Sequence, residues 1–223
     1  MKSISRLLGI LALAAVSACS YIDMTEPVPE FDLPQVLYDG QTYVFKDLVP
    51  RISYQWSLSD ETNAWFENDM LVASVPSTKA IVEEEHIARP LTVLAQNRRH
   101  PEYTFERKTE IHPWELVFVG MNDMALGGGS CSVDATVKLA MYDVVSRKLI
   151  NNIDDGKRLP KYRDVKLVLE SIDQEDGLEL IAADDVFMTF KAVQPGSYTV
   201  VASLKNGSRK DKDIAATATL VVE

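Results

Sequence analysis

The chain has 223 residues, of which 46% are hydrophobic and 25% are charged. This composition is typical of a packed globular protein and excludes an intrinsically disordered chain, and the length suffices for one large domain or two domains of roughly 100 residues each. The formal net charge of −10 opposes contact with a polyanion, so we expect no nucleic-acid partner.

The first eighteen residues have the pattern of an export signal. Lys2 and Arg6 give a positive start, and an apolar run of ten residues follows from Leu7 to Val16. A run of this length is too short to cross a bilayer of about 30 Å as a helix. It ends in "VSAC" (residues 16–19), two small residues followed by a cysteine. This ending resembles the signal sequence of bacterial lipoproteins.

The resemblance implies that residues 1–18 are removed as a signal peptide and that Cys19 becomes the first residue, modified with palmitate-type acyl chains. Loss of the two cations of the signal peptide moves the side-chain charge from −10 to −12. More than one acyl chain gives stable membrane attachment. Ser20 follows the cysteine, which in this family implies the outer membrane, on the periplasmic face or the cell surface. An ordinary signal peptide with a chance cysteine is the alternative.

Residues 19–32 are expected to form a lipidated tether, because proline and acidic residues mix there without periodicity. From residue 33 onward the sequence predicts strands, since short runs of β-branched and aromatic residues alternate with turn signals. Asp39-Gly40 is one such turn, and alternation over residues 52–58 places Tyr54 and Trp56 on one face. The predicted strands of the first half are 35–38, 41–45, 52–58, 69–74, 90–97 and 103–111. An acidic segment, residues 78–88, is the one place where a helical turn is expected.

His112-Pro113 marks a predicted boundary, because proline lacks the N–H that a strand ladder needs and forces its neighbour to be extended. The predicted strands of the second half are 114–120, 132–145, 162–172, 178–183, 185–193, 196–204 and 213–222. The last hairpins of the two halves correspond, with a period of about 105 residues. We therefore predict two β-sandwich domains in tandem, residues 33–113 and 114–223. A single larger β domain is the alternative.

Two stretches carry a resemblance to bacterial immunoglobulin-like and PKD-like modules. The stretch "VQPGSYTVVASLKNG" (residues 193–207) is similar to their Pro-Gly turn and following strand, and "ISYQWSLSD" (residues 52–60) is similar to the strand whose tryptophan fills their core. The resemblance implies an all-β fold of two antiparallel Ig-like sandwiches. The chain departs from antibody-type domains because it lacks the cysteine pair between the sheets, and its second half has Leu169 near the tryptophan position.

Cys131, in "GGGSCS" (residues 127–132), is the candidate for covalent chemistry, and it has no partner for a disulfide once the other cysteine carries lipid. A nucleophilic cysteine needs a nearby base and a lowered pKa, and the chain offers His86, His100 and His112. The stretch lies between two predicted strands and lacks the last glycine of a nucleophile elbow. The sequence therefore favours a buried, unreactive thiol over a catalytic or redox-active one.

Acidic loops are the candidates for metal binding. The stretch "EEEH" (residues 83–86) has no second histidine at the i+4 position, so a solvated loop is favoured over a zinc site. The loops at residues 152–164 and 171–177 supply carboxylates that calcium prefers, but Gly177 is the fifth residue from Asp173, whereas an EF-hand has its glycine at the sixth. No cofactor is predicted, with calcium as the alternative.

Together these features predict a non-enzymatic, lipid-anchored cell-envelope protein that acts in binding, adhesion or scaffolding. The expected partners are the membrane, through the lipid, and a protein or surface glycan of the envelope, contacted through turns or by strand addition at a free sheet edge. Trp65-Phe66, in a polar segment between predicted strands, is either an exposed binding anchor or core packing, and core packing is favoured. The rival function is an envelope hydrolase or thiol-dependent enzyme that uses Cys131 with a histidine.

Overall fold

The computed structural model describes residues 28–67, 70–74, 88–126, 129–150, 166–184, 186–205 and 214–223. Within these residues the chain is all-β, as predicted, and the helix that is described in full is a short 3-10 turn, η3 (Glu175–Gly177). No helix in the described ranges is long and apolar enough to cross a bilayer. The predicted signal peptide, Cys19 and the acidic stretch at residues 83–86 lie outside the described residues.

The first half of the chain folds into two sheets that share one core. Their strand orders are β1-β7-β6-β3 and β2-β5-β4. The bounds are β1 (Val36–Tyr38), β2 (Thr42–Val44), β3 (Tyr54–Leu58), β4 (Ala64–Glu67), β5 (Met70–Ala73), β6 (Arg89–Asn97) and β7 (His100–His112). The predicted turn at Asp39-Gly40 carries the chain from one sheet to the other, and Gly40 has a φ of 73°, which glycine adopts without strain.

The second half forms a larger pair of sheets. One has the order β8-β10-β14-β13, with β11 pairing to the end of β10, and the other has the order β12-β15-β16-β9. The bounds are β8 (Trp114–Gly120), β9 (Ser130–Cys131), β10 (Thr136–Asp143), β11 (Lys148–Leu149), β12 (Lys166–Ile172), β13 (Leu178–Ala183), β14 (Phe187–Ala192), β15 (Gly196–Lys205) and β16 (Ile214–Val222).

Both halves have the strand order of an immunoglobulin-like sandwich, which places strands A, B, E and D in one sheet and C, F and G in the other. In the second half, β8, β10, β14 and β13 take the A, B, E and D places, and β12, β15 and β16 take C, F and G. In the first half, β2, β5 and β4 take B, E and D, and β3, β6 and β7 take C, F and G. The chain is therefore two Ig-like sandwiches in tandem.

The sheets are not purely antiparallel, which corrects the sequence-based expectation. β1 runs parallel to β7, and β9 runs parallel to β16. In each sandwich a short strand near the start of the sequence pairs with the outer edge of the last strand, and the paired strands run in the same direction. β4, β9 and β11 were not predicted, because strands of two to four residues are too short to show a clear period.

The first core is aromatic. Trp56 stacks on Phe45 with ring centroids 4.3 Å apart and on Tyr54 at 5.0 Å, while Phe31 meets it edge-on at 5.1 Å. Such pairs add about 0.5–1.5 kcal/mol each beyond the area they bury. Trp56 is half-buried against the core, in the role that the family resemblance implies. Phe31, which the sequence analysis placed in the tether, is buried in this core.

The second core contains a tyrosine corner. Tyr198, near the start of β15, is buried, and its hydroxyl donates a hydrogen bond to the backbone oxygen of Gln194 at 2.9 Å. This contact is a hallmark of Ig-like sandwiches. Gly177 lies against the tyrosine ring so closely that a Cβ there would come within 1.9 Å of it, so only glycine fits this position.

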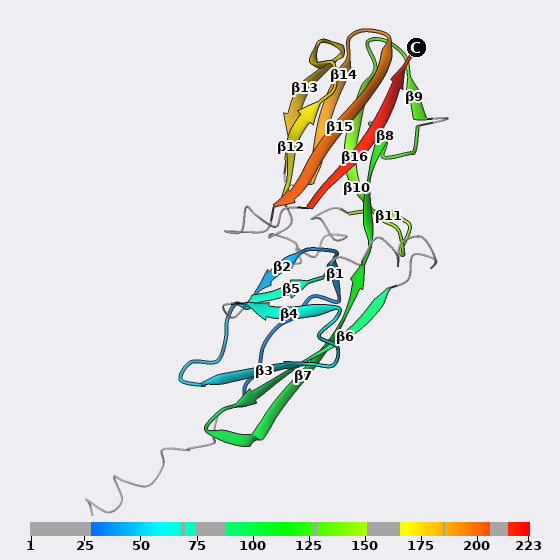
Figure 1. Ribbon diagram of the computed structural model, residues 1–223. Helices are drawn as coiled ribbons and strands as arrows, with labels where there is room; N and C mark the ends of the chain where they lie inside the picture. Colours follow the sequence, from blue (N-terminus) through cyan, green and yellow to red (C-terminus); the bar gives the residue numbers. More distant parts are fainter. Residues whose placement is uncertain are drawn as a thin grey trace, which may run out of the picture.

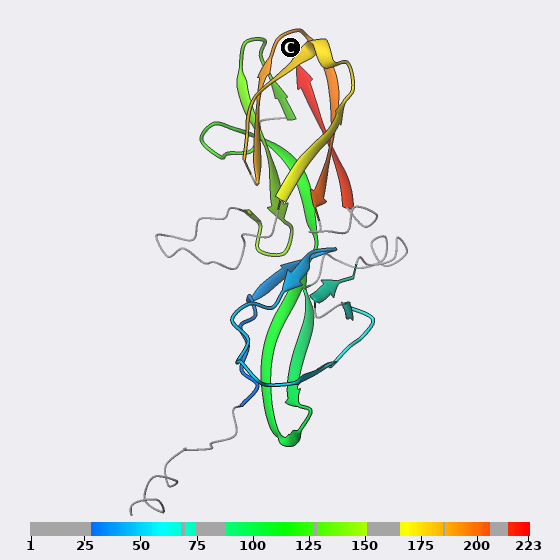
Figure 2. The same ribbon diagram turned by 90° about the vertical axis from the view of Figure 1, so that its left-hand side faces the viewer.

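The two sandwiches lie end to end (Figure 1), and a single residue, Pro113, separates β7 from β8. The blue start of the described chain and the β6–β7 turn lie at the free end of the first sandwich, and the C-terminus lies at the opposite end of the molecule. The view turned by 90° in Figure 2 shows the same elongated arrangement. The predicted boundary at His112-Pro113 falls between the two sandwiches; that residues 33–113 and 114–223 are independent domains stays a prediction.

Candidate functional site

The two sandwiches meet at a junction of buried side chains. Tyr38 belongs to β1 of the first sandwich, yet it is buried in the core cluster of the second. Trp114, the first residue of β8, packs against the same cluster, and its indole Nε1 donates a hydrogen bond to the backbone oxygen of Asp39 at 3.1 Å. Burying a large side chain stabilises a fold by about 1.5–3 kcal/mol. The first half therefore contributes directly to the second core.

His112, the last residue of β7, is held between two carboxylates. Its Nδ1 lies 2.8 Å from Oδ2 of Asp143, at the end of β10, and its Nε2 lies 3.2 Å from Oε2 of Glu110. The side chains of His112 and Asp143 are each 6% exposed. The other oxygen of Asp143 accepts hydrogen bonds from the backbone N–H groups of Val145 and Ser146, both at 2.9 Å. Both oxygens of this buried carboxylate are therefore satisfied.

Asp39 and Arg89 form an ion pair beside this contact. The guanidinium group of Arg89 contacts Oδ1 of Asp39 and also donates to the backbone oxygen of Ser74 at 3.0 Å. Burial raises the pKa of Asp39 to about 6, because desolvation outweighs the opposing attraction of Arg89. The backbone N–H of Asp39 donates to the backbone oxygen of His112 at 3.0 Å. The Asp39–Arg89 ion pair and the His112–Asp143 contact are thus linked through the backbone.

The polar contacts at the junction have a structural role rather than a catalytic or metal-binding one. Arg89 and His112 engage the two aspartates, and a metal site would need those carboxylates free. Across the described ranges, no group of three or more His, Cys, Asp or Glu is placed to hold a metal ion. Both ring nitrogens of His112 face carboxylates, so neither is directed at a nucleophile.

Cys131 lies at the other end of the second sandwich. It forms β9 with Ser130 and pairs with Val222, at the end of β16. The sequence favours a buried thiol that enters the next strand; the thiol is instead half-buried, in a short strand of its own. Burial raises the pKa of this thiol, which is the reverse of the activation that a nucleophilic cysteine needs.

The structure separates Cys131 from the two described histidines. His112 lies at the junction, while Cys131 lies at the far end of strands that are roughly 20 Å long. His100 is farther away, at the start of β7. A catalytic pair of Cys131 with either histidine is therefore excluded. His86 lies outside the described residues.

Of the two loops considered for calcium, the one at residues 171–177 is described and the one at 152–164 is not. In the described loop the backbone N–H of Asp173 donates to the oxygen of Thr199 at 2.9 Å, and that of Gly177 donates to the oxygen of Gln174 at 3.1 Å. The segment closes as a turn, and its described carboxylates, Asp173 and Asp176, belong to no cluster of metal ligands. This loop gives the calcium alternative no support.

Trp65 and Phe66 lie in β4 rather than on a loop. Phe66 packs on the first core, 5.6 Å from the ring of Trp56. Trp65 is partly buried and is paired with Val72 of β5. The core-packing interpretation is therefore confirmed for Phe66, and the pair is not an exposed loop anchor.

A structured turn after β8 is the feature that the sequence analysis missed. Met121 and Met124 are 53% and 66% exposed, and the turn between them is closed by a hydrogen bond from the N–H of Gly120 to the oxygen of Met124 at 2.9 Å. Lys138 braces it from β10, with Nζ 2.8 Å from Oδ1 of Asp123. We call residues 121–124 the methionine turn. Its sequence signal is Asn122-Asp123, a typical turn pair, flanked by apolar residues.

The edges of the second sandwich are less suited to strand addition than the sequence analysis expected. β12 and β13 each form the edge of a sheet. The register of β12 shifts between Leu169 and Ser171, and that of β13 shifts between Leu180 and Ala182. Such bulges bend an edge strand and interrupt its row of free backbone groups, which blocks pairing with another chain. Contacts through turns are favoured over contacts through these two edges.

No family profile matches this sequence. No curated protein matches it. Among solved structures, the FdeC adhesin of Escherichia coli is similar at 13% identity and a TM-score of 0.30, over 85% of this chain and 62% of that one.

Two further structures are cadherin domains. Mouse cadherin-23 EC22-24 is similar at 15% identity and a TM-score of 0.28, over 91% of this chain and 66% of that one. Protocadherin gamma B7 domains 1–4 are similar at 12% identity and a TM-score of 0.27, over 88% of this chain and 50% of that one. The chain therefore spans from half to about two-thirds of the length of these proteins. At such TM-scores the fold assignment rests on the strand order and not on these neighbours.

Proposed function

We propose that this protein is a non-enzymatic lipoprotein, attached to the outer membrane through Cys19, that binds or scaffolds an envelope partner with its Ig-like sandwiches. The observation that carries the proposal is the end-to-end arrangement of the two sandwiches (Figure 1). The described chain starts at the free end of the first sandwich, and the exposed methionine turn belongs to the second sandwich, beyond the junction. Tyr38 and the His112–Asp143 contact favour a fixed relation between the two sandwiches. A rigid spacer of this kind holds a binding surface away from the membrane.

A protein partner is favoured over a surface glycan. Exposed, flexible methionine side chains suit apolar protein surfaces, and the methionine turn offers two of them on a rigid base. A glycan site would offer aromatic platforms and polar side chains, whereas the aromatic candidates Trp65 and Phe66 are engaged in strand β4.

Lipidation is tested in cells by replacing Cys19 with alanine. We expect the wild-type protein to incorporate labelled palmitate and to fractionate with outer membranes, and the C19A variant to lose both properties. Palmitate in the variant, or release of the wild-type protein without detergent, would overturn the anchor.

The binding surface is tested by a photo-crosslinking amino acid at position 124. We expect a discrete crosslinked product in intact cells that Met121→Asp abolishes. The same probe at Val193, an exposed apolar residue at the start of the β14–β15 turn, serves as the control. Equal crosslinking at both positions would count against the methionine turn.

The enzymatic alternative is tested by alkylating Cys131 and by Cys131→Ala. The raised thiol pKa predicts slow alkylation at neutral pH. We expect partner crosslinking to be unchanged in C131A. A function that disappears in C131A while the fold remains intact would restore the thiol-dependent alternative.

A further inference from the structure

Three arginines gather at the end of the first sandwich where the described chain begins. Arg98 and Arg99 occupy the β6–β7 turn, and Arg51 lies in the neighbouring β2–β3 loop. The backbone N–H of Arg98 donates to the oxygen of Ser53 at 2.8 Å, which brings the turn and the loop together. All three arginines are exposed, and their guanidinium groups make no ion pair or hydrogen bond with a described residue. We call Arg51, Arg98 and Arg99 the basal arginine group.

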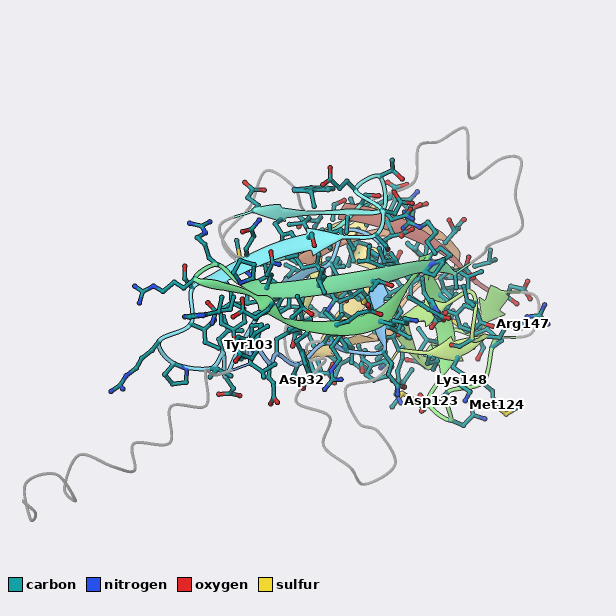
Figure 3. All side chains as sticks on the ribbon, turned by 90° about the horizontal axis from the view of Figure 1, so that it is seen from below. Asp32, Tyr103, Asp123, Met124, Arg147 and Lys148 are labelled. Carbon is teal, nitrogen blue, oxygen red and sulfur yellow. The ribbon has the colours of Figure 1, made fainter. Side chains whose placement is uncertain are left out.

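The chain leaves the first sandwich beside this group. The backbone oxygen of Glu30 accepts a hydrogen bond from the hydroxyl of Tyr54 at 2.8 Å, and Tyr54 is paired with Asn97, the residue before Arg98. Figure 3 views the molecule from this end, with nitrogen-tipped side chains extending outward near the β6–β7 turn at the left. The segment that leads back to Cys19 therefore starts next to the basal arginine group.

The distance along the chain to the lipid is short. Val28, the first described residue, is nine residues from Cys19. An extended chain spans at most about 3.6 Å per residue, and a flexible one of this length has an average span of roughly 17 Å. Attraction between exposed charges reaches about 8 Å at physiological salt. A tether of this length keeps the basal arginine group close enough to the headgroups to touch them repeatedly.

We propose that the basal arginine group docks on anionic phospholipid headgroups of the membrane that carries the lipid anchor. The proposal rests on lipidation of Cys19. Arginine suits this partner because its planar guanidinium binds phosphate oxygens in pairs. The chain as a whole is acidic, with a net charge of −10, so an unneutralised basic group at this end favours one orientation over all others.

Neighbouring charges limit the strength of the contact. Glu102 lies 3.5 Å from His100, and Glu106 lies 3.9 Å from Lys108, whose ammonium group partly offsets the charge of Glu106. Glu30, at the chain exit, opposes the approach of the arginines to an anionic surface. Each arginine at such a surface favours the docked state by about fivefold, and the three together by up to about 100-fold before this repulsion. The contact orients the protein, and the lipid anchors it.

The experiment uses the full mature, lipidated protein in vesicles of neutral phosphatidylcholine, and in the same vesicles with phosphatidylglycerol added. Amide hydrogen exchange is followed in the peptide that covers residues 96–101. We expect exchange there to slow by at least about threefold on the anionic vesicles only. The slowing disappears when added salt shortens the screening length to a few ångströms. A peptide across the β14–β15 turn, residues 193–197, shows no change.

The triple variant R51Q/R98Q/R99Q is expected to exchange at the same rate on both kinds of vesicle. Its matched control is R147Q/K148Q/K166Q, which removes three exposed cations of the second sandwich and keeps the slowing. Equal exchange of the wild-type protein on neutral and anionic vesicles overturns the proposal, and so does a slowing that survives in the triple variant.

Failure of the proposed anchor has a different signature. If Cys19 carries no lipid, the protein does not float with neutral vesicles at all, whatever its arginines do. If the anchor is present and the docking is wrong, the protein floats with both kinds of vesicle and the exchange rates are equal.

Discussion

His112 and Asp143 form a buried contact that joins the last strand of the first sandwich to the second sandwich. The 2.8 Å distance between Nδ1 and Oδ2 lies where both side chains are largely shielded from water. A buried carboxylate that loses a partner keeps its full desolvation cost, so this contact links the stability of the junction to one side chain.

Replacement of His112 by leucine is expected to lower the free energy of unfolding by about 1–3 kcal/mol, because Asp143 would keep only its two backbone donors. Urea denaturation measures this loss. His100→Gln is the control, since that histidine is more exposed at the start of β7, and it should change stability by less than about 0.5 kcal/mol. Equal effects of the two substitutions would show that the buried contact contributes nothing.

Replacement of Tyr38 by alanine is expected to destabilise the second sandwich, although the residue belongs to the first. Removing a buried aromatic side chain costs about 3–5 kcal/mol, and the cavity would open in the second core. Hydrogen exchange in β10 and β14 should therefore accelerate. Tyr103→Ala, a partly exposed position on β7, should leave those strands unchanged. Faster exchange confined to the first sandwich would contradict this placement of Tyr38.

Asp39 is expected to make stability depend on pH in mildly acidic solution. Its pKa rises from 3.8 in the unfolded chain to about 6 in the fold, so between these values the folded protein holds a proton that the unfolded chain has released. The free energy of unfolding therefore falls as pH rises through this window, by at most about 3 kcal/mol. Asp39→Asn removes the dependence. Denaturation at several pH values should show the wild type losing stability relative to the variant as pH rises from 3.8 to about 6; a constant difference would refute the assignment.

Two substitutions at the tyrosine corner are expected to lower stability by different amounts. Tyr198→Phe removes the hydroxyl that donates to the backbone oxygens of Gln194 and Pro195, and should cost about 1 kcal/mol. Gly177→Ala should cost more, because the new Cβ would overlap the ring of Tyr198. Melting temperatures should therefore fall from wild type to Y198F to G177A. Tyr142→Phe, a partly exposed position on β10, is the control, and the reverse order would show that the ring moves aside freely.

The hairpins that close each sandwich were predictable from sequence. Residues 90–97 and 196–204 were assigned as strands, and β6 and β15 occupy Arg89–Asn97 and Gly196–Lys205. Alternation of apolar and polar residues over eight or more positions carries that signal. The sequence also predicted that Trp56 packs into the first core, and it does so.

The junction could not be read from the sequence. Asp39 contacts Arg89 fifty positions away, and His112 contacts Asp143 thirty-one positions away. The first contact forms within the first sandwich and the second joins the two sandwiches. Both depend on tertiary packing, and no local period encodes that. The exposure of the methionine turn could not be predicted for a related reason. In the sequence, its two methionines look like core residues, and only the fold places them on the surface.

The parallel pairs at the sandwich edges have a mechanical consequence. If the lipid holds one end of the molecule and a partner pulls on the other, tension enters β1 at its start and leaves β7 at its end. Because β1 and β7 run in the same direction, the pull slides one strand along the other and loads their hydrogen bonds together rather than one at a time. The pair of β9 and β16 has the same geometry. A tethered protein built this way would resist stretching while bound.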